Sequence, residues 1–561
     1  MKRASRFLPA LILLGSLSVW ASPPQVILTD SARREVLQSE IMSESFQEKL
    51  DVVSGSKRRG GNEVLLLVNA RMSIPVRYQL IDNAKRSIVI STFTAYADEK
   101  NGQITDESTR VLVEKLIAAK KRGVEIKVIL DGASVSMAGS HIVVQSLRDA
   151  GIKVIKYNPI VSDDYDLKSF QALPHAVYRF FADHNPLRNR WHEKTMVIDG
   201  TYGIIGGINW GDLYIGNNFS SAVYSVKEFY AHPLIREIGV PPRDEWEESI
   251  PASYRDTDVL VKGPVVEEAL RQLLLDFSLL DILNKKSRHD QYRDITTEDA
   301  DAARTLFNRE YQDNPIYFNG AQDDLVQGWG AAREPQEVRY ISQRPFLERT
   351  FTENFNYLIN YAKENDVYVN QENPSLRISN LYINLINKAQ KQILWGCHSN
   401  RPTPEMLEAL EAAALRGVQI IIIGNSQATA NTLPDKGFLM YGKGEAYYKS
   451  LLRSGRGNIR IFEWQDKATV DGQELRSGAF HSKVFSVDGV ISSIGSYNMA
   501  SASFESHTEG TLVVNDAAFT QSVEEMFQKD LRFTKEVHLQ NILDKEAERR
   551  RKRRVKSSPR H

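Results

Sequence analysis

The chain has 561 residues, of which 42% are hydrophobic, 25% charged and 9% aromatic, and these ordinary proportions exclude a wholly disordered, collagen-like or multi-span membrane protein. Its 71 basic and 71 acidic residues balance, but residues 1–21 hold three basic residues and residues 549–561 hold eight, with no acid in either segment. Residues 22–548 therefore carry a net charge of −11, which argues against a general nucleic-acid-binding protein.

The first 21 residues have the features of a secretory signal peptide. Lys2, Arg3 and Arg6 form a positive segment, residues 7–19 form an apolar run, and Ala21 ends a pattern typical of signal cleavage sites. The run is too short for an ordinary membrane span. We therefore expect export with cleavage after Ala21; the alternative is an uncleaved anchor. The single cysteine, Cys397, excludes an internal disulfide, and we expect it to be a buried thiol at the end of a strand.

After an N-terminal extension over residues 22–62, the same succession of elements is predicted twice. The predicted elements are a helix near 78–84, a strand at 87–93, a helix at 109–122 and a strand at 124–130, and then their counterparts at 385–389, 392–395, 404–416 and 418–423. The segments Ala118-Ala119-x-x-Arg122-Gly123-Val124 and Ala412-Ala413-x-x-Arg416-Gly417-Val418 are almost identical. This repeat predicts an α/β protein with a duplicated domain.

The two copies set the expected domain boundaries. The first domain covers residues 63–280, with an insertion at about 215–254, and the second covers residues 346–540. Residues 281–345 are polar and are predicted to be a linker or insert with a helix from Thr297 to Tyr311. Residues 541–561 form a basic C-terminal tail.

Each copy contains one longer motif that carries candidate catalytic residues. From the histidine, a lysine follows at +2, an aspartate at +7 and an asparagine at +17, and the two copies are 289 residues apart at every position. The motif residues are His192, Lys194, Asp199 and Asn209 in the first copy and His481, Lys483, Asp488 and Asn498 in the second.

The spacing predicts that each motif folds as a β-hairpin turning at Asp-Gly. With the turn centred on residues 200–201, His192 lies opposite Asn209 and Lys194 opposite Gly207. The equivalent turn at residues 489–490 sets His481 opposite Asn498 and Lys483 opposite Ser496. A bulge would change this register. Asp199 and Asp488 are expected to be structural and to close the turns.

The predicted patch suits a phosphate group. The lysines supply positive charge, Asn209, Asn498 and Ser496 supply hydrogen-bond donors, and an imidazole attacks phosphorus or transfers a proton near neutral pH. One histidine cannot be nucleophile and leaving-group acid at once. Two copies divide these roles if the halves meet face to face.

The two His-x-Lys-x4-Asp motifs resemble those of the phospholipase D superfamily, over most of residues 65–280 and 345–535. The segments around Gly206-Gly207-Ile208-Asn209-Trp210-Gly211-Asp212, around Asp256-Thr257-Asp258 and around Tyr447-Tyr448-Lys449 are similar to its bacterial cardiolipin synthase branch. Ala502 and His507 depart from the Arg and Asn usual in the second motif. The resemblance implies two domains, each a mixed β-sheet flanked by helices, with the active site at their pseudo-twofold interface.

The resemblance also implies an acidic residue that orients the catalytic histidine of the opposite half. By motif match these residues are Glu509 and Asp256, with Asp258 as the rival of Asp256. The implied reaction is phosphatidyl transfer, in which His192 forms a phosphohistidine and His481 acts as acid and then base. No cofactor or metal is expected, since two lysines supply the positive charge. Which histidine attacks first is carried over from the family.

The implied substrates are phospholipids such as phosphatidylglycerol or phosphatidylethanolamine, with cardiolipin synthesis as the leading interpretation. Three alternatives remain: a phospholipase that releases phosphatidic acid, a metal-independent nuclease, and a membrane-bound scaffold with an inactive site. We expect a monomer in the bacterial periplasm, at a membrane surface or secreted. Its basic tail either binds an anionic membrane or is a solvated extension without function.

Overall fold

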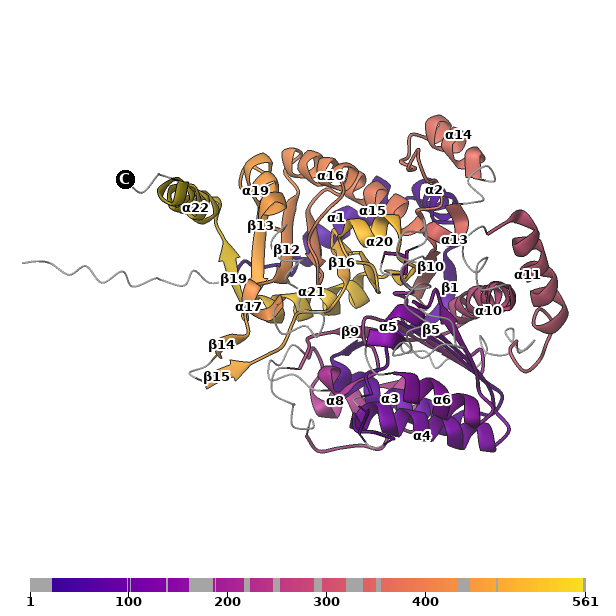
Figure 1. Ribbon diagram of the computed structural model, residues 1–561. Coiled ribbons are helices and arrows are strands. Elements are labelled where there is room, and N and C mark those ends of the chain that lie inside the picture. Colours follow the sequence, from indigo (N-terminus) through magenta and orange to yellow (C-terminus); the bar gives the residue numbers. More distant parts are fainter. Residues whose placement is uncertain are drawn as a thin grey trace, which may run out of the picture.

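The computed structural model describes residues 23–97, 99–100, 102–137, 140–160, 185–186, 188–215, 222–245, 253–286, 295–318, 336–349, 355–430, 444–470 and 473–557. The expected signal peptide lies outside these residues. Within the described part, no helix is both long and apolar enough to cross a membrane. Helices cover both faces of a large sheet, and the two halves of the chain lie on either side of its middle (Figure 1).

The sheet has 15 strands, arranged so that the two halves repeat in mirrored order. From one edge to the other the order is β19-β13-β12-β11-β16-β17-β18-β10-β1-β9-β8-β7-β2-β5-β6. The first half supplies β1 (Arg59–Val68), β2 (Ser87–Thr92), β5 (Glu125–Asp131), β6 (Lys153–Tyr157), β7 (Thr195–Ile198), β8 (Tyr202–Gly206) and β9 (Thr257–Lys262). The second half supplies β10 (Gln336–Gln343), β11 (Gln392–Gly396), β12 (Gln419–Asn425), β13 (Ile459–Trp464), β16 (Val484–Val487), β17 (Ile491–Gly495), β18 (Glu509–Asn515) and β19 (Thr534–Val537). Two small hairpins, β3 (Glu99–Lys100) with β4 (Gln103–Ile104) and β14 (Lys467–Val470) with β15 (Gln473–Arg476), lie outside this sheet.

The helices repeat in the same way. The first half has α3 (Ala70–Asn83), α4 (Glu107–Lys121), α5 (Gly132–Met137), α6 (His141–Asp149), α8 (Val226–Ala231), α9 (Pro233–Ile238) and α10 (Pro264–Lys285). The second half has α13 (Pro345–Arg349), α14 (Asn356–Asn365), α15 (Arg377–Lys388), α16 (Pro404–Leu415), α17 (Gln427–Ala430), α19 (Gly444–Ser454), α20 (Ser501–Glu505), α21 (Ala517–Leu531) and α22 (Leu539–Ser557). Before and between the halves lie α1 (Asp30–Leu37), α2 (Glu44–Ser54) and α11 (Thr297–Glu310).

The repeated Arg-Gly-Val segment has one structural purpose in both halves. Gly123 and Gly417 follow α4 and α16 with φ of 94° and 98°, a conformation that favours glycine. The preceding Arg122 and Arg416 donate to the carbonyl oxygens of residues 81 and 386, near the ends of α3 and α15, at 2.8 and 2.7 Å. The repeated segment therefore holds α4 against α3 and α16 against α15 by the same contact. The predicted duplicated α/β fold is confirmed.

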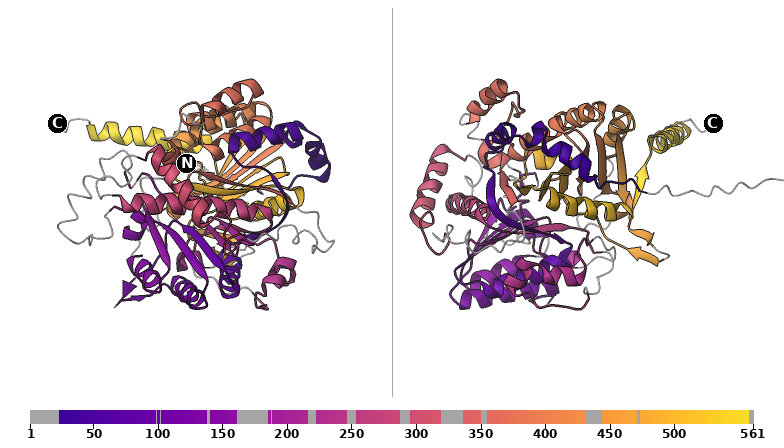
Figure 2. Two further views of the ribbon diagram at one scale, coloured as in Figure 1. Left: turned by 90° about the vertical axis from the view of Figure 1, so that its right-hand side faces the viewer. Right: turned by 180° about the vertical axis from the view of Figure 1, so that it is seen from behind.

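Two expected boundaries differ in the structure. β10 falls inside the stretch predicted to be a linker, yet it pairs with β18 and with β1 at the centre of the sheet. Val36, Phe46 and Leu50, in the expected N-terminal extension, are buried in the core of the second half, and α1 and α2 lie along that half in Figure 2. The hydrophobic pattern did not predict β10, because the strand contains polar residues that are buried. One of them, Arg339, is buried because it pairs with Asp51 at 2.6 Å.

Candidate active site

The motif hairpins are β7–β8 and β16–β17, and their register differs by one residue from the prediction. Ile198 pairs with Tyr202, so His192 is not placed opposite Asn209, nor Lys194 opposite Gly207. Val487 pairs with Ile491, so the predicted pairings of His481 with Asn498 and of Lys483 with Ser496 are wrong in the same way. The cause lies at the turns. Asp199 and Asp488 adopt positive φ of 54° and 53° and leave the ladder.

Both turn aspartates fasten their hairpin to the neighbouring strand. Asp199 accepts hydrogen bonds from the backbone N–H groups of residues 85–87 at 2.8–3.0 Å. Asp488 accepts from those of residues 390–392 at 2.7–2.9 Å. These contacts hold the start of β2 and β11 against the turn and give each aspartate a structural position.

The backbone before each motif strand pairs with the opposite half of the chain. The N–H of His192 donates to the carbonyl of Thr508 at 3.0 Å, and the N–H of His481 donates to the carbonyl of Arg255 at 2.7 Å. Both contacts continue short bridges, Trp191 with Thr508 and Arg255 with Phe480. The two histidines are thus held at the interface of the halves, in equivalent positions.

A carboxylate from the opposite half lies beside each histidine. Nδ1 of His192 is 2.9 Å from Oε2 of Glu509, and Nδ1 of His481 is 2.6 Å from Oδ2 of Asp256. Asp258 instead pairs with Arg77 at 2.7 Å. Because a carboxylate accepts the hydrogen of Nδ1, each imidazole has Nε2 left for chemistry.

Neighbours hold the two carboxylates in different ways. Ser496 and Ser503 both donate hydroxyl hydrogen bonds to Glu509, the latter at 2.6 Å. At the equivalent of Ser496 the first half has Gly207, where an added Cβ would lie 2.1 Å from Oδ1 of Asp256. Gly207 therefore leaves the space that Asp256 needs to reach His481.

The motif lysines lie beside the histidines. Lys194 and Lys483 donate to the backbone carbonyls of His192 and His481, respectively. Burial lowers the pKa of Lys194 to about 7 and that of Lys483 to about 8, and the charge of Lys483 contributes to the first shift. A bound phosphate diester would offset these shifts, because its negative charge favours the protonated amines.

The pKa values of the two histidines are lowered, whereas those of the two carboxylates are raised. Burial, followed by the charges of the two lysines, holds the pKa of both His192 and His481 well below the usual range. Burial raises the pKa of Glu509 and raises that of Asp256 to about 6. These shifts favour neutral imidazoles at pH 7, which is the form that a nucleophile requires.

The side-chain amides of the two motif asparagines lie in the site. Nδ2 of Asn209 donates to the hydroxyl of Tyr214 at 2.7 Å, and the backbone N–H of Asn498 donates to Ser503 at 3.2 Å. The Oδ1 atoms of both side chains are buried without a hydrogen-bond partner among the described residues. Since amide O and N are assigned from their contacts, either end of these amides can serve a ligand.

Aromatic rings surround the two histidines, and the sequence pattern did not assign them to the site. Phe93 and His507 lie 5.0 and 5.4 Å from His192 between ring centroids. Tyr214, Tyr254 and His398 lie 5.5, 5.9 and 5.2 Å from His481. Phe93 and His398 follow equivalent strands, so the repeat itself is the signal that could have found them.

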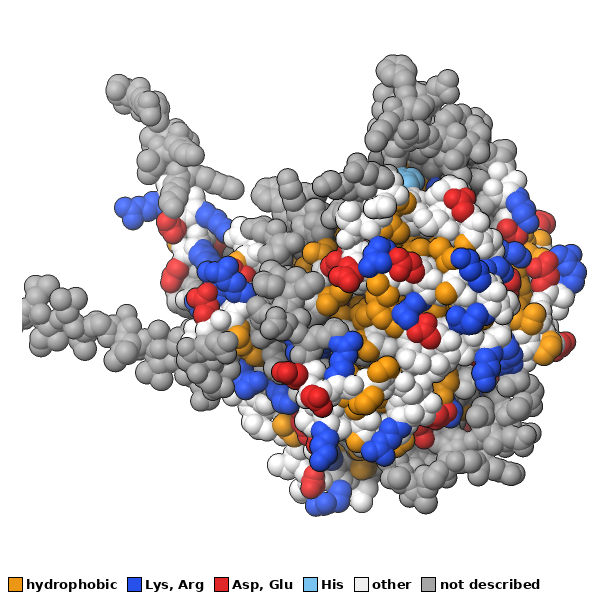
Figure 3. Space-filling view, turned by 90° about the horizontal axis from the view of Figure 1, so that it is seen from below, with side chains coloured by type: hydrophobic (Ala, Val, Ile, Leu, Met, Phe, Trp, Pro, Cys, Tyr) orange, Lys and Arg blue, Asp and Glu red, His pale blue; other side chains and the backbone are white. Residues whose placement is uncertain are grey.

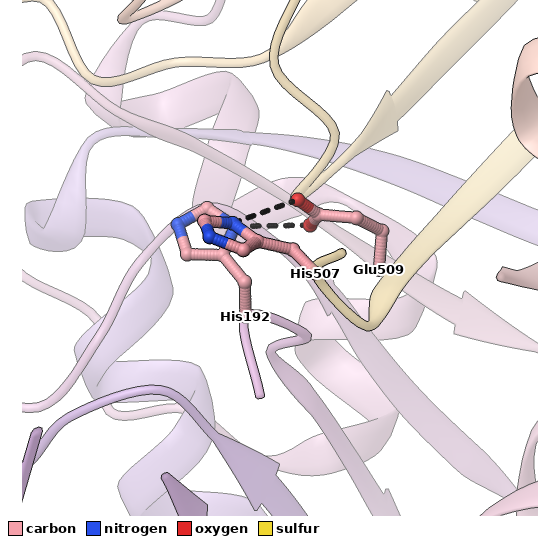
Figure 4. Close-up of side chains that lie close together, drawn as sticks. All are labelled: His192, His507 and Glu509. Atoms are coloured by element: carbon pink, nitrogen blue, oxygen red, sulfur yellow. Dashed lines mark hydrogen bonds and ion pairs between the residues drawn. The ribbon is translucent and has the colours of Figure 1, made fainter. Parts of the chain in front are cut away.

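His192, His507 and Glu509 lie close enough together to be considered as metal ligands (Figure 4). Their donor atoms lie within 4.8 Å of one another. Figure 4 shows both imidazoles directed at the Glu509 carboxylate, and its Oε2 is already in hydrogen-bond contact with His192. The donor set fits a hydrogen-bonded Glu–His pair as it stands.

Known proteins are similar to this chain in sequence. The family model described as "Cardiolipin synthase, PLD-like domain" matches residues 78–237 and 382–531, more than half of the chain. A cardiolipin synthase of Geobacillus sp. (strain WCH70) is 24% identical over 470 residues, which are 84% of this chain and 66% of that protein. Cardiolipin synthase A of Pseudomonas fluorescens (strain SBW25) is 26% identical over 477 residues, covering 85% and 70% of the two chains.

A solved structure supports the fold. The phosphatidylserine synthase of Haemophilus influenzae Rd KW20 superimposes with a TM-score of 0.51 at 13% identity, covering 91% of this chain and 99% of that one. The two segments matched by the family model contain both His-x-Lys-x4-Asp motifs. The chain therefore belongs to the cardiolipin synthase, PLD-like domain family of the phospholipase D superfamily, an enzyme superfamily, as its motifs predicted.

Proposed function

We propose that the protein is a cardiolipin synthase-like phosphatidyltransferase that works through a phosphohistidine intermediate. The observation that carries the proposal is the pair of histidines at the interface, each with Nδ1 against a carboxylate of the opposite half. Two such imidazoles 289 residues apart in the sequence divide the roles of nucleophile and acid. The family and its relatives support phospholipids as the substrate class.

In the first step, Nε2 of His192 attacks the phosphorus of a phospholipid phosphodiester. The bond to the headgroup oxygen breaks, and His481 gives that oxygen a proton, so the alcohol leaves. The anionic diester near His481 raises the pKa of this imidazole and thereby allows it to carry the proton. Lys194, Lys483 and the free amide ends of the asparagines stabilise charge on the phosphoryl oxygens.

In the second step, His481 removes a proton from the acceptor hydroxyl, which attacks the phosphohistidine and releases His192. A second phospholipid as acceptor gives cardiolipin, whereas water gives phosphatidic acid. The branch resemblance favours the lipid acceptor. Glu509 stabilises the imidazolium that forms on His192 during attack, as Asp256 does for His481.

The two alternatives of other kinds have weaker support. A nuclease needs a basic surface, but residues 22–548 are acidic overall, and basic and acidic side chains are interspersed on the face in Figure 3. A scaffold with an inactive site needs no intact motifs, but both copies keep the residues that the chemistry needs.

We further propose that the protein is exported and held at an anionic membrane surface. The first 21 residues support export. The basic helix α22 leaves the body of the protein at its edge (Figure 1), where Lys449 of α19 pairs with its Glu546 at 2.6 Å. Each basic residue near an anionic surface contributes about 1 kcal/mol.

Incubation of the mature protein with phosphatidylglycerol and phosphatidylethanolamine, with and without chelator, tests the function. Cardiolipin is the expected product, phosphatidic acid indicates hydrolysis, and complete inactivation by chelator contradicts a metal-free reaction. His192→Ala and His481→Ala should each abolish turnover. His538→Ala is the matched control, because His538 is exposed, and it should retain wild-type turnover.

A further inference from the structure

His398 contributes a second imidazole to the His481 side of the interface. It follows β11 and Cys397 in the chain, and its ring centroid lies 5.2 Å from that of His481 at an interplanar angle of 53°. Its Nε2 is buried and has no hydrogen-bond partner among the described residues. Leaving a buried polar atom unsatisfied costs about 1–3 kcal/mol, so this atom is a candidate for contact with a ligand.

The repeat shows that this imidazole is an addition to one half only. Ile88 of β2 pairs with Ile198, and Ile393 of β11 pairs with Val487, the two partners being equivalent motif positions. Five residues further along, the first half has Phe93 and the second has His398. The ring of Phe93 lies 5.0 Å from His192. At this repeat position, therefore, His192 has a hydrocarbon ring beside it, whereas His481 has an imidazole.

The position of His398 is fixed relative to His481. Asn425, at the end of β12, donates through Nδ2 to the carbonyl of His398 at 3.0 Å and to that of Phe480 at 2.8 Å. Its Oδ1 accepts from the N–H of Phe480, also at 2.8 Å. One amide thus clamps the backbone of His398 to the residue before His481.

The surroundings of His398 define the chemistry of its ligand. Burial, followed by the neighbouring His481 and the charge of Lys483, holds the pKa of His398 well below the usual range. A neutral imidazole both donates and accepts, as a hydroxyl does. Arg401 and Lys194 add positive charge to the same environment, which disfavours a cationic headgroup such as ethanolamine or choline.

We propose that His398 is a specificity-determining residue that hydrogen-bonds, through Nε2, a further hydroxyl of the alcohol that leaves or enters on the His481 side. The site then selects neutral polyol alcohols, of which the glycerol headgroup is the simplest, over simple alcohols of similar size. This inference rests on the proposed function, because it assigns the alcohol that His481 protonates and deprotonates.

The test measures how the enzyme partitions one phosphatidyl group between two acceptors. A short-chain phosphatidylglycerol labelled in its acyl chain is incubated in micelles with equal concentrations of deuterated glycerol and 1-propanol, and mass spectrometry gives the ratio of the two products. This ratio does not depend on how much of the enzyme is folded. His398→Phe, which copies Phe93, should lower the glycerol-to-propanol ratio by about tenfold, the loss expected for one hydrogen bond.

Two further variants keep the test decisive if His398→Phe does not fold. His398→Gln places an amide near the position of Nε2 and should keep a glycerol-to-propanol ratio within about threefold of wild type. His398→Leu should lower this ratio about as much as His398→Phe does. The exposed His538→Phe is the matched control. Equal ratios in wild type, His398→Phe, His398→Gln and His398→Leu would overturn the inference. Absence of any product from the wild-type enzyme would instead refute the proposed function.

Discussion

Replacing Glu509 by Gln tests whether a carboxylate supplied by one half increases the reactivity of the histidine in the other half. Glu509 is fully buried and lies 2.9 Å from Nδ1 of His192. When His192 attacks phosphorus, its ring becomes cationic. Two unit charges about 4 Å apart at an effective dielectric constant near 20 interact by about 4 kcal/mol. Glutamine keeps the shape and removes this interaction, so kcat should fall about 10³-fold.

The assay is phosphatidyl transfer from phosphatidylglycerol under saturating conditions, together with the melting temperature of each variant. Glu505→Gln is the matched control, because Glu505 forms an exposed pair with Arg188 at 3.1 Å and such pairs contribute little. Ser503→Ala removes one hydrogen bond to Glu509 and should lower kcat about fivefold. A folded Glu509→Gln variant with kcat within tenfold of wild type would refute the reasoning.

Three other outcomes follow from the same geometry. Because the pKa values of the two motif lysines are lowered to about 7 and about 8, these amines lose charge as pH rises, and kcat/KM should fall on the alkaline side; a flat profile from about pH 6 to 9 would contradict this. Asp530→Ala leaves the buried Arg255 without its bidentate partner and should lower the free energy of unfolding by about 3–5 kcal/mol in urea titrations. Arg110→Ala, in an exposed pair, should change the free energy of unfolding by at most about 0.5 kcal/mol. Similar losses in the Asp530→Ala and Arg110→Ala variants would refute the expectation that the buried pair contributes more. Gly207→Ala should abolish turnover without unfolding the chain, while Gly60→Ala, whose added Cβ meets nothing within 4 Å, should be active; an active Gly207→Ala variant would show that the carboxylate tolerates displacement.

The sequence predicted the repeated elements because each depends on local patterns. Helix ends at Gly123 and Gly417 and the apolar strands β5 and β12 follow from turn chemistry and hydrophobic runs. The two motifs located both histidine–lysine pairs, because the same residue types recur at the same spacing in each copy. The fold class and the superfamily were therefore predictable from one chain.

Long-range contacts decided what the sequence could not predict. The hairpin register slipped by one residue because Asp199 bonds the backbone of a strand more than 100 residues earlier. β10 was taken for linker because its buried Arg339 is neutralised by Asp51 from α2. His398 gave no pattern of its own, and its position beside His481 depends on the pairing of β11 with β16.

The stereochemical course at phosphorus tests the central claim most directly. A phospholipid made chiral at phosphorus with sulfur and an oxygen isotope is converted by the enzyme, and the configuration of the product is determined by NMR. A phosphohistidine pathway uses two in-line displacements, so we predict net retention of configuration. Net inversion would show that the acceptor attacks phosphorus directly and would contradict the account.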